Sequence, residues 1–473
     1  MASFTVDEII EATGGKVLWG SAKGRIRRVT TDSRDVRKGD LFVALKGPQF
    51  NGHRFVSRAI EDGAVGALIS RRAWATVSPW FRERKRADSP ASSFVIGVTD
   101  SWRGYQDLAG YHRSRFSFPL VAVTGSNGKT TAKEMVSQVL ARQWRTLKTQ
   151  GNFNNSLGVP MTLLRLSSRH EAAVIEMGVD QEGQTTRLCE MAKPTVGLIT
   201  NVGPDHLEFF GTIEGSARGK AELLPTLPHD GVAVLNADDS YFTTFSRASR
   251  CRIVSYGFSD KADVRASDVV LNRQGSQFRL HLPHRTRAKH VQLRVSGQHN
   301  VSNALAGAAV GYALGLSAQE LSMGLEKTRP ASMRSQIHRV KGVTYLYDCY
   351  NANPASMEAA LDLLVELARG SRAIAVLGEM RELGVGEAAF HVGVGTYVAR
   401  KNISSLIVCG KLGVKMATGA KDAGMSTSTI STVKTVQEAA HILQRIVRRG
   451  DVVLLKASRG VQMEQVLEFM AQG

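Results

Sequence analysis

Residues 118–140 most constrain what this chain can fold into, because a strand, a glycine-rich turn and a helix follow one another directly. The apolar run 118–123 is typical of a buried strand. Apolar residues then recur three and four positions apart from Ala132 to Leu140, which indicates the buried face of a helix. A helix that begins after such a turn presents N–H groups and a partial positive charge to an anion. The order therefore predicts a phosphate-binding loop.

The turn reads G-x-x-G-K-T, which is shorter than the general G-x-x-x-x-G-K-[ST] pattern because position 123 is valine. Glycines allow the backbone to close around phosphates. We expect Lys129 to reach the terminal phosphates and the Thr130 hydroxyl to hold Mg²⁺. An ordinary strand–helix turn is the alternative, which the lysine and two threonines at the helix start make less favoured. The predicted loop consists of Gly125, Ser126, Asn127, Gly128, Lys129, Thr130 and Thr131.

Length and composition indicate a globular protein of about three domains. Of the 473 residues, 43% are hydrophobic and 22% are charged, and no segment has the apolar length needed to span a bilayer. At the N-terminus, Thr5 and Glu8 predict a capping box for a short helix that Gly14 ends, which is not the pattern of a signal peptide. The four cysteines lie far apart, which is typical of reduced thiols. We expect a cytoplasmic protein that does not insert into membranes.

The net charge of +19 allows two classes of partner. A basic surface can bind nucleic acid, and it can equally serve anionic small substrates. The basic residues are scattered, and the run at 81–86 follows Pro79 without alternating aromatic residues, so we expect it to be a solvated loop. Small-molecule substrates are therefore favoured over nucleic acid.

The pattern of strands and helices predicts an α/β protein with domains at 1–105, 106–325 and 326–473. Four Val/Ile/Leu-rich strands between helices predict a parallel sheet covered on both faces in the middle domain. The stretch 250–296 reads as an antiparallel insertion. The last domain reads as a second α/β unit without a phosphate loop of its own. Its strands are expected in VTYLYDCY, RAIAVLGEM, SLIVCGK and DVVLLKA.

Polar residues follow several strands of the middle domain, where ligands of open α/β sheets collect. A carboxylate and a neutral imidazole near the phosphate loop could hold Mg²⁺, although a single histidine is also commonly a structural hydrogen-bonding group. Lys220 lies in a predicted helix, and on residue physics alone it is a solvated lysine. The residues that follow these strands are Glu176, Asp205, His206, Asn236, Asp238 and Asp239.

Three further polar clusters suit either ligand binding or local capping. One is a turn before the strand LFVAL, the second is a pair of amides at a helix start that could face a planar ring such as adenine, and the third is a loop closed by Pro354. For the third, the density of polar groups favours function slightly. The clusters are Asp32, Ser33 and Arg34; Asn300 and Asn303; and Asp348, Asn351 and Asn353.

Taken in order along nearly the whole chain, these motifs resemble the Mur ligases of peptidoglycan synthesis. The motifs are TDSRDVRKGDLFVAL, TGSNGKTT, NFNNSLGVP, VIEMG, ITNVGPDH, SGQHNVSNALAG and DCYNANP. Within the family, the stretches DCYNANP and AVLGEMRELG look like those of the ligases that act last in the synthesis of the peptidoglycan precursor. No DNPR stretch occurs, unlike in many members that add the third residue. Folylpolyglutamate synthases share the phosphate loop but not the TDSR or NANP stretches. The alternatives, in order, are another Mur-type or folylpolyglutamate-type amino acid ligase and a basic P-loop ATPase that binds nucleic acid.

The resemblance implies a three-domain, monomeric enzyme that uses ATP and Mg²⁺. The first domain would hold a UDP-sugar, the central P-loop ATPase-type domain ATP, and the Rossmann-like last domain the incoming dipeptide. The implied reaction adds D-alanyl-D-alanine to UDP-N-acetylmuramoyl-tripeptide through an acyl phosphate.

The same resemblance implies roles for individual residues. Lys129, His206 and Lys220 would be catalytic, and Thr130, Glu176 and His206 would hold Mg²⁺. Lys220 matches a position where relatives carry a carbamylated lysine, although its GKAE setting departs from theirs. ATP would be bound by the loop together with Asn300, Asn303, Arg334 and Asp348. The substrates would be bound by Asp32, Ser33, Arg34, Asn152, Asn154, Asn155, Asn351 and Asn353.

Two further stretches depart from the family pattern. Met333 precedes Arg334 where many relatives have glycine, and KASRG at 456–460 replaces KGSRG.

Overall fold

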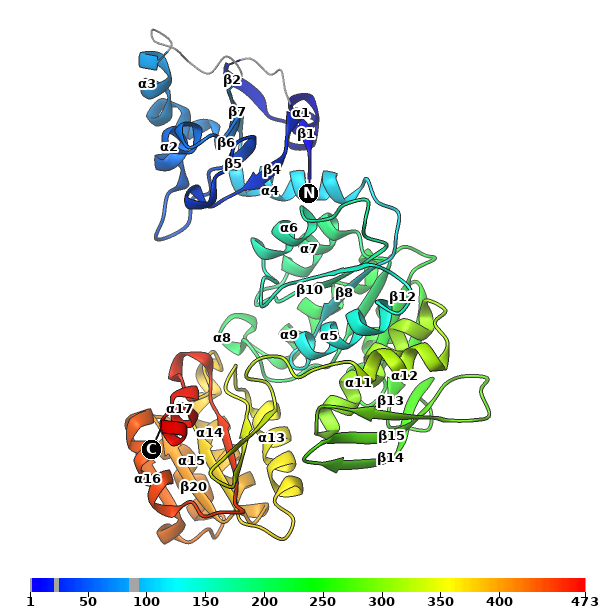
Figure 1. Cartoon of the computed structure of the whole chain (residues 1–473), viewed down its shortest axis with the longest axis vertical. Coiled ribbons are helices and arrows are strands. Elements are labelled where there is room, and N and C mark those ends of the chain that lie inside the picture. Colours follow the sequence, from blue (N-terminus) through cyan, green and yellow to red (C-terminus); the bar gives the residue numbers. More distant parts are fainter. Residues whose placement is uncertain (1, 21–24, 85–92, 473) are drawn as a thin grey trace. The chain divides into compact units, whose positions relative to one another are not determined.

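The computed structural model of the chain describes residues 2–20, 25–84 and 93–472, and Figure 1 labels its main helices and strands. The chain divides into two compact units. Each unit is assembled from more than one segment of the chain, because the chain leaves and re-enters it. Unit 1 comprises Met1–Leu120, Leu147–Met177 and Thr186–Pro194, and unit 2 comprises Val121–Thr146, Gly178–Thr185 and Thr195–Gly473. The predicted α/β class is confirmed by the sheets and helices of both units.

Unit 1 contains a five-stranded sheet in the order β2-β7-β6-β5-β4. Only β2 runs antiparallel to its neighbour. The predicted strand LFVAL is confirmed as part of β5, whose four residues are all buried. The strands are β2 (Lys16–Gly20), β4 (Arg28–Thr30), β5 (Asp40–Val43), β6 (Gly66–Ser70) and β7 (Phe94–Val98).

The predicted N-terminal helix is confirmed as α1 (Val6–Thr13). The Thr5 hydroxyl accepts a hydrogen bond from the Glu8 N–H, and the Glu8 carboxylate accepts one from the Thr5 N–H at 2.7 Å. Gly14 ends the helix at φ +60°, a left-handed conformation that glycine adopts without steric cost. The local signals alone therefore determine both ends of this helix.

The other elements that lie wholly or mostly in unit 1 are short. The predicted domain boundary after residue 105 falls within α4, and the three predicted domain ranges stay predictions. These elements are β1 (Phe4–Thr5), β3 (Arg25–Ile26), α2 (Val56–Glu61), α3 (Trp74–Arg84), α4 (Ser101–Arg113), β9 (Thr146–Lys148), α6 (Gly158–Leu163), β10 (Ala172–Glu176) and α7 (Gln184–Ala192), with 3-10 turns at Ser33–Asp35, Gly52–Phe55 and Arg71–Ala73.

The solvated loop predicted at 81–86 is wrong for its first part. Helix α3 continues through Pro79 to Arg84, and the rest of the run lies outside the described residues. Phe81 is fully buried, with its ring 4.6 Å from that of Trp19 and 4.8 Å from that of Trp80. These aromatic contacts bury one face of the helix, which is why this part of the run is not a solvated loop.

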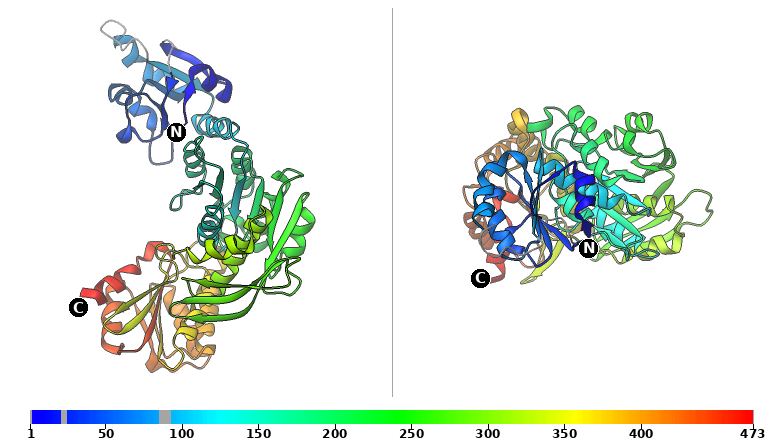
Figure 2. Two further views of the ribbon diagram at one scale, coloured as in Figure 1. Left: turned by 45° about the vertical axis from the view of Figure 1, so that its right-hand side comes forward. Right: turned by 90° about the horizontal axis from the view of Figure 1, so that it is seen from above.

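Unit 2 contains a mixed sheet whose strand order includes the run β16-β15-β14-β13-β12-β11-β8. Its later strands, β13 to β16, are drawn in green in Figure 2. The prediction of an antiparallel insertion over 250–296 is wrong for its first strand, because β13 runs parallel to β12 and extends the parallel sheet. Strand β14 is also parallel to β13, and the antiparallel pairs are β14–β15 and β15–β16, within the same sheet. The strands are β8 (Leu120–Thr124), β11 (Val196–Ile199), β12 (Val232–Asn236), β13 (Arg252–Gly257), β14 (Val264–Asn272), β15 (Gly275–His281) and β16 (Lys289–Leu293).

Helix α11 packs closely on α5 beside this sheet. A Cβ at Gly307 of α11 would lie 3.2 Å from the Met135 Cβ of α5, so the absence of a side chain brings the two helices together. The helices here are α5 (Lys129–Leu140), α8 (Leu207–Phe210), α9 (Ile213–Ala221), α10 (Phe242–Ala248), α11 (Gln298–Ala313) and α12 (Ala318–Glu326), with a 3-10 turn at Leu224–Thr226.

A second sheet of unit 2 has the order β17-β18-β22-β19-β20-β21, and all of its strands except β17 are parallel. The four predicted strands are confirmed, whereas β17 and β21 were not predicted. The strands are β17 (Gln336–Val340), β18 (Val343–Tyr347), β19 (Ala373–Leu377), β20 (Ser405–Cys409), β21 (Ile430–Val433) and β22 (Val452–Lys456).

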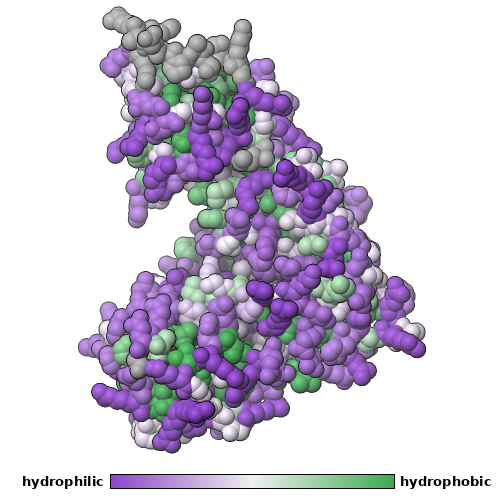
Figure 3. Space-filling model, viewed as in Figure 1, coloured by the Kyte–Doolittle hydropathy of each residue, from purple (hydrophilic) through white to green (hydrophobic). Residues whose placement is uncertain are grey.

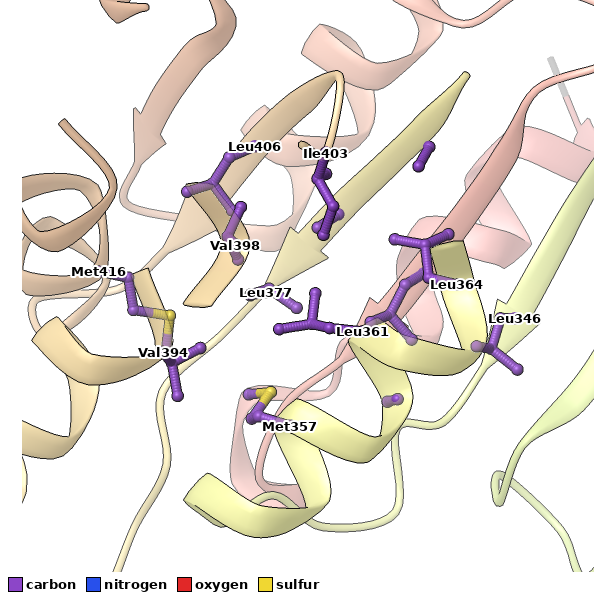
Figure 4. Close-up of a cluster of buried hydrophobic side chains, with 14 of the residues drawn as sticks. Leu346, Met357, Leu361, Leu364, Leu377, Val394, Val398, Ile403, Leu406 and Met416 are labelled. Carbon is purple, nitrogen blue, oxygen red and sulfur yellow. The ribbon is translucent and has the colours of Figure 1, made fainter. Parts of the chain in front are cut away.

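Helices cover both faces of this second sheet, and each face has its own apolar core. In one core, shown in Figure 4, Leu361 and Val394 pack over Leu377. In the other, Leu443 and Val466 belong to the same cluster as Val453. The helices are α13 (Pro354–Leu367), α14 (Glu387–Arg400), α15 (Gly413–Asp422), α16 (Val436–Ile446) and α17 (Glu464–Gln472), with 3-10 turns at Gly384–Gly386, Thr427–Thr429 and Arg459–Val461.

The cysteines and the surface complete the description. All four cysteines are free thiols; Cys189, Cys349 and Cys409 are buried, and Cys251 is partly exposed. Hydrophilic residues cover most of the face shown in Figure 3. In the described part of the chain, no helix has both the length and the apolar character of a membrane-crossing segment.

Candidate functional site

The predicted phosphate loop lies between β8 and α5, and two of its residues have backbones that require glycine. Gly125 has φ +138°, and a Cβ there would lie 2.0 Å from the Thr200 hydroxyl oxygen. Gly128 has φ +82°, and a Cβ there would lie 2.3 Å from the Asn303 side-chain oxygen. No side chain caps the start of α5, where Thr130 and Thr131 occupy the first turn. The local geometry is that of an anion-binding loop.

Residues after β11 hold the loop in place. The Asn201 side-chain oxygen accepts a hydrogen bond from the Asn127 N–H at 2.9 Å. The Asn201 backbone oxygen accepts one from the Ser126 N–H at 2.9 Å, and the Thr200 hydroxyl donates to the Asn127 carbonyl at 2.6 Å. The sequence analysis assigned no role to Thr200 or Asn201, although both follow a buried strand, which was the available signal.

Lys129 folds over the loop that it belongs to. Its Nζ donates to the Gly125 carbonyl at 2.5 Å and to the Ser126 carbonyl at 3.1 Å. The ammonium group therefore lies at the centre of the curved backbone. This is the position from which it can interact with a bound polyphosphate.

A buried polar network lies directly beside the loop. Asp205 Oδ1 accepts hydrogen bonds from Ser126 Oγ at 2.6 Å, Ser216 Oγ at 2.9 Å and Lys220 Nζ at 3.1 Å. Lys220 is 1% exposed, so the expectation of a solvated lysine is wrong. The reason is tertiary, since α9 turns the side chain inward towards Asp205. The sequence analysis missed Ser216, although it precedes Lys220 by one helical turn.

Burial and pairing together set the charges of this network. Burial lowers the pKa of Lys220 to about 8, although Asp205 acts in the opposite direction. Burial also acts to raise the pKa of Asp205, but the nearby charges of Lys220 and Lys129 hold it below its usual value. The Asp205 carboxylate is therefore ionised at neutral pH.

His206 follows Asp205 in a left-handed conformation, with φ +50°. Its Nδ1 lies 2.6 Å from Glu382 Oε2, in the loop after β19. The sequence analysis predicted a role for His206 but not for Glu382, whose motif was noted only as a family likeness.

The polar residues after β12 are structural. Asp238 accepts hydrogen bonds from the Phe258 and Ser259 N–H groups, and Asp239 accepts one from the Val202 N–H. Asn236 donates to a backbone carbonyl, that of Thr200. These three side chains therefore stabilise turns at the edge of the sheet.

Glu176 ends β10 in unit 1 and is 1% exposed. Its Oε1 accepts a hydrogen bond from Asn154 Nδ2 at 2.8 Å. The Asn155 side-chain oxygen accepts from the N–H groups of Leu157 and Gly158 in the turn that leads into α6. The stretch 152–155 thus combines structural contacts with two exposed amides, those of Asn152 and Asn155.

The predicted turn Asp32–Ser33–Arg34 is also in unit 1. Asp32 caps it by accepting from the Arg34 N–H and pairs with the Arg34 guanidinium at 2.7 Å. This contact lowers the pKa of Asp32 to about 2. The Arg34 side chain is 87% exposed.

The two amides at the start of α11 are both buried. Asn300 Nδ2 donates to the Ser296 carbonyl at 2.7 Å, a structural contact with the segment before α11, and no side chain caps the start of that helix. Asn303 lies against Gly128, as the clash described above shows. Only Asn303 is therefore in contact with the phosphate loop.

Asn127 of the loop is also linked to the second sheet of unit 2. Asn353 caps α13 through its side-chain oxygen, and its Nδ2 donates to Asn127 Oδ1 at 2.9 Å. The predicted loop residue Asn351 is exposed. Asn353 thus has both a capping contact and a contact with the loop.

Asp348 and Arg334 lie on neighbouring segments. Asp348 pairs with Lys456 at 2.5 Å and accepts a hydrogen bond from the Ser335 N–H. The Arg334 guanidinium lies 4.1 Å from the centre of the Tyr350 ring. The sequence analysis missed both Tyr350 and Lys456 as partners.

Three protein-family models match consecutive parts of the chain. They are described as "Mur ligase family, catalytic domain" over residues 25–106, "Mur ligase middle domain" over 123–311 and "Mur ligase, glutamate ligase domain" over 333–459. These matches follow the order of the three larger sheets along the chain.

Similar proteins are matched over nearly their full length. The UDP-N-acetylmuramoyl-tripeptide--D-alanyl-D-alanine ligase of Bacillus subtilis (strain 168) is 33% identical over 448 residues, which cover 94% of this chain and 93% of that protein. The crystal structure I of MurF from Acinetobacter baumannii is 30% identical with a TM-score of 0.89, covering 100% of this chain and 99% of that one. The crystal structure of MurF ligase from Thermotoga maritima in complex with ADP is 28% identical with a TM-score of 0.82, covering 94% and 97%. The family resemblance drawn from the motifs is confirmed, and the chain belongs to the Mur ligase family.

Proposed function

We propose that this protein joins D-alanyl-D-alanine to UDP-N-acetylmuramoyl-tripeptide at the expense of ATP, in the synthesis of the peptidoglycan precursor. The observation that carries the proposal is the phosphate loop, in which Lys129 folds back onto the backbone. The chain also matches UDP-N-acetylmuramoyl-tripeptide--D-alanyl-D-alanine ligases over nearly its whole length. We further propose that it acts in the cytoplasm as a monomer, on small-molecule substrates and without nucleic acid.

The reaction needs a leaving group, because a carboxylate is a poor electrophile. An oxygen of the tripeptide carboxylate would attack the γ-phosphorus of ATP, and ADP would leave with the electrons of the broken P–O bond. The amine of D-alanyl-D-alanine would attack the acyl carbon and lose a proton, and phosphate would leave from the tetrahedral intermediate. Both steps bring anions together, so Lys129 and the start of α5 would stabilise the developing charge.

Mg²⁺ prefers oxygen ligands and is commonly held by few protein groups together with nucleotide phosphates, and we propose the following groups for it. Thr130 would supply a hydroxyl oxygen, Glu176 a carboxylate and His206 an imidazole nitrogen. Among the described residues no group of three or more His, Cys, Asp or Glu side chains that could hold a metal ion is present. When bound, Mg²⁺ would offset negative charge on the phosphates.

The remaining residues would bind the substrates. Asn303 and Asn300 would lie near adenine, and Arg334 and Asp348 near the rest of ATP. Lys220 would act beside the metal, where a carbamylated side chain could present a carboxylate. UDP-sugar and dipeptide would be held by the substrate-binding residues predicted above: Asp32, Ser33, Arg34, Asn152, Asn154, Asn155, Asn351 and Asn353.

The test measures phosphate release from ATP in Mg²⁺ buffer with UDP-N-acetylmuramoyl-tripeptide, with and without D-alanyl-D-alanine. We expect release only with both substrates and one UDP-muramoyl-pentapeptide per phosphate. Tripeptides ending in lysine or in meso-diaminopimelate are compared, since the third residue is undetermined. Lys129→Ala should abolish release, whereas Lys415→Ala, which removes an exposed lysine from α15, should not.

Other results would replace the proposal. Release that depends on a different amino acid acceptor would indicate another ligase of the Mur or folylpolyglutamate type. Release stimulated by RNA or DNA, with a steep dependence on salt, would indicate a nucleic-acid-dependent ATPase.

A further inference from the structure

We propose that Glu382 is a positioning residue for His206, holding the imidazole so that Nε2 is the nitrogen presented to the nucleotide-bound Mg²⁺. This inference rests on the proposed function, because it assigns a partner to a residue of the same site. The two residues are 176 positions apart, so only the fold brings them together.

The hydrogen bond between the two side chains determines which ring nitrogen carries the hydrogen. His206 Nδ1 lies 2.6 Å from Glu382 Oε2. An ionised carboxylate can only accept hydrogen bonds, so Nδ1 is the donor. The lone pair of a neutral imidazole is then on Nε2, the arrangement in which histidines bind metals while a carboxylate orients them.

The backbone holds the two residues at the same place. Glu208 N–H donates to the Glu382 carbonyl at 3.2 Å, which gives a second link between the segments. A Cβ at Gly384 would lie 3.3 Å from the Glu208 backbone, so the chains approach closely. His206 and Glu382 both have left-handed conformations, with φ +50° and +65°. Such conformations in non-glycine residues cluster at functional sites.

The other side of His206 is fixed by the phosphate loop. The preceding residue, Asp205, accepts the hydrogen bond from Ser126 described above. His206 therefore lies between a residue anchored to the loop and a carboxylate from the segment after β19. The residue before His206 is thus anchored to the loop and its imidazole to Glu382, both within unit 2.

The competing explanation is a surface latch, by which we mean an exposed side-chain pair that only helps to hold the two segments together. The side chains are 29% and 48% exposed, and exposed pairs contribute little to folding stability. A latch would affect only stability, whereas a positioning residue determines the histidine tautomer and the metal affinity. These two quantities therefore separate the explanations.

The experiment compares Glu382→Ala and Glu382→Gln with Glu208→Gln, a control that removes an exposed carboxylate two residues from His206. Protein labelled with ¹⁵N-histidine is examined by NMR, and the His206 signals among the 12 histidines are identified by their loss in His206→Gln. We expect hydrogen on Nδ1 in the wild type and in Glu208→Gln. In Glu382→Ala it should move to Nε2, the commoner tautomer in solution. Glu382→Gln should retain Nδ1–H, because the amide oxygen still accepts.

The metal readout does not depend on turnover. Mn²⁺ binding in the presence of ADP is followed by EPR, and the Mg²⁺ concentration for half-maximal phosphate release is measured beside it. We expect Glu382→Ala to lower the affinity for Mn²⁺ by about 10- to 100-fold and to raise the Mg²⁺ concentration for half-maximal release by a similar factor. The effect of Glu382→Gln should be smaller. Glu208→Gln should match the wild type.

Three outcomes would overturn the inference. One is an unchanged tautomer in Glu382→Ala, and another is a changed tautomer with unchanged Mn²⁺ affinity. The third is loss of thermal stability alone, which identifies a latch. Failure of the proposed function would be distinguishable from these outcomes. The wild-type protein would then make no pentapeptide product, whereas the NMR and EPR measurements could still test the role of Glu382.

Discussion

Asp205 and Lys220 form a buried ion pair beside the phosphate loop, with Oδ1 and Nζ 3.1 Å apart and both side chains less than a tenth exposed. The pair links α9 to the segment after β11. Because Asp205 also accepts from Ser126, the pair supports the loop itself. Its removal therefore affects folding as well as chemistry.

Removing one member of this pair should be strongly destabilising. Asp205→Leu leaves a buried ammonium without its carboxylate, and we expect a loss of about 3–5 kcal/mol in the free energy of unfolding. The double variant Asp205→Leu/Lys220→Met leaves no buried charge and should recover most of that loss. Urea unfolding of the two single variants, the double variant and the wild type measures the coupling. Additive losses would show that the two groups do not interact.

Between neutral and alkaline pH, the free energy of unfolding of the wild type should increase with pH because of Lys220. Its pKa is lowered to about 8 in the folded protein from 10.5, so the unfolded chain binds more protons between these values. The stability contribution of Lys220 is therefore fully present above pH 10.5 and is lost as the pH falls through 8. Urea unfolding of the wild type and Lys220→Met from pH 7 to 10 isolates it as a difference. We expect the free energy of unfolding of the wild type to rise relative to that of Lys220→Met as the pH rises. A difference that does not change with pH would contradict this prediction.

Gly128→Ala should damage the phosphate loop more than its backbone strain alone predicts. The new Cβ would meet Asn303 at 2.3 Å, displacing the loop, and a misplacement of about 1 Å can lower turnover about 100-fold. Gly424→Ala is the matched control, because Gly424 has φ +94° and no atom within 4 Å of the added Cβ. Steady-state phosphate release is the measurement. Equal effects in both variants would mean that strain, and not the contact with Asn303, is responsible.

Tyr350 should matter through its ring and not through its hydroxyl. The ring lies 4.1 Å from the Arg334 guanidinium, a cation–π contact worth about 0.5–1 kcal/mol at partly exposed sites. Tyr350→Leu should therefore lower kcat/KM for ATP by about 2- to 5-fold, and Tyr350→Phe should leave it unchanged. If both variants lose activity equally, the hydroxyl has a role of its own.

Features determined by neighbouring residues could be predicted from the sequence. The capping box of α1 involves only Thr5, Glu8 and Gly14, and the phosphate loop depends on glycines whose positive φ angles no other residue adopts easily. Each of these inferences needed only a few consecutive residues.

Features determined by distant partners could not be predicted in the same way. Lys220 looked solvated because its partner Asp205 precedes the helix that carries it, and the inward direction of that helix depends on the whole sheet. Glu382 was missed because 176 residues separate it from His206. The parallel direction of β13 was also missed, since a single strand's sequence does not state which neighbour it pairs with. For these features the residue types are evident, but their pairing is a property of the complete fold.

The distribution of the cysteines gives the protein built-in reporters of partial unfolding. Buried Cys189 belongs to unit 1, whereas buried Cys349 and Cys409 belong to unit 2. Burial raises the pKa of the Cys409 thiol to about 11 and also raises that of Cys349, so both react slowly until their surroundings open. A thiol-reactive probe of known mass, added to the native chain in increasing urea, would label each cysteine at the rate at which its own unit opens. Peptide mass spectrometry would then measure the opening free energies of the two units separately, in one intact molecule.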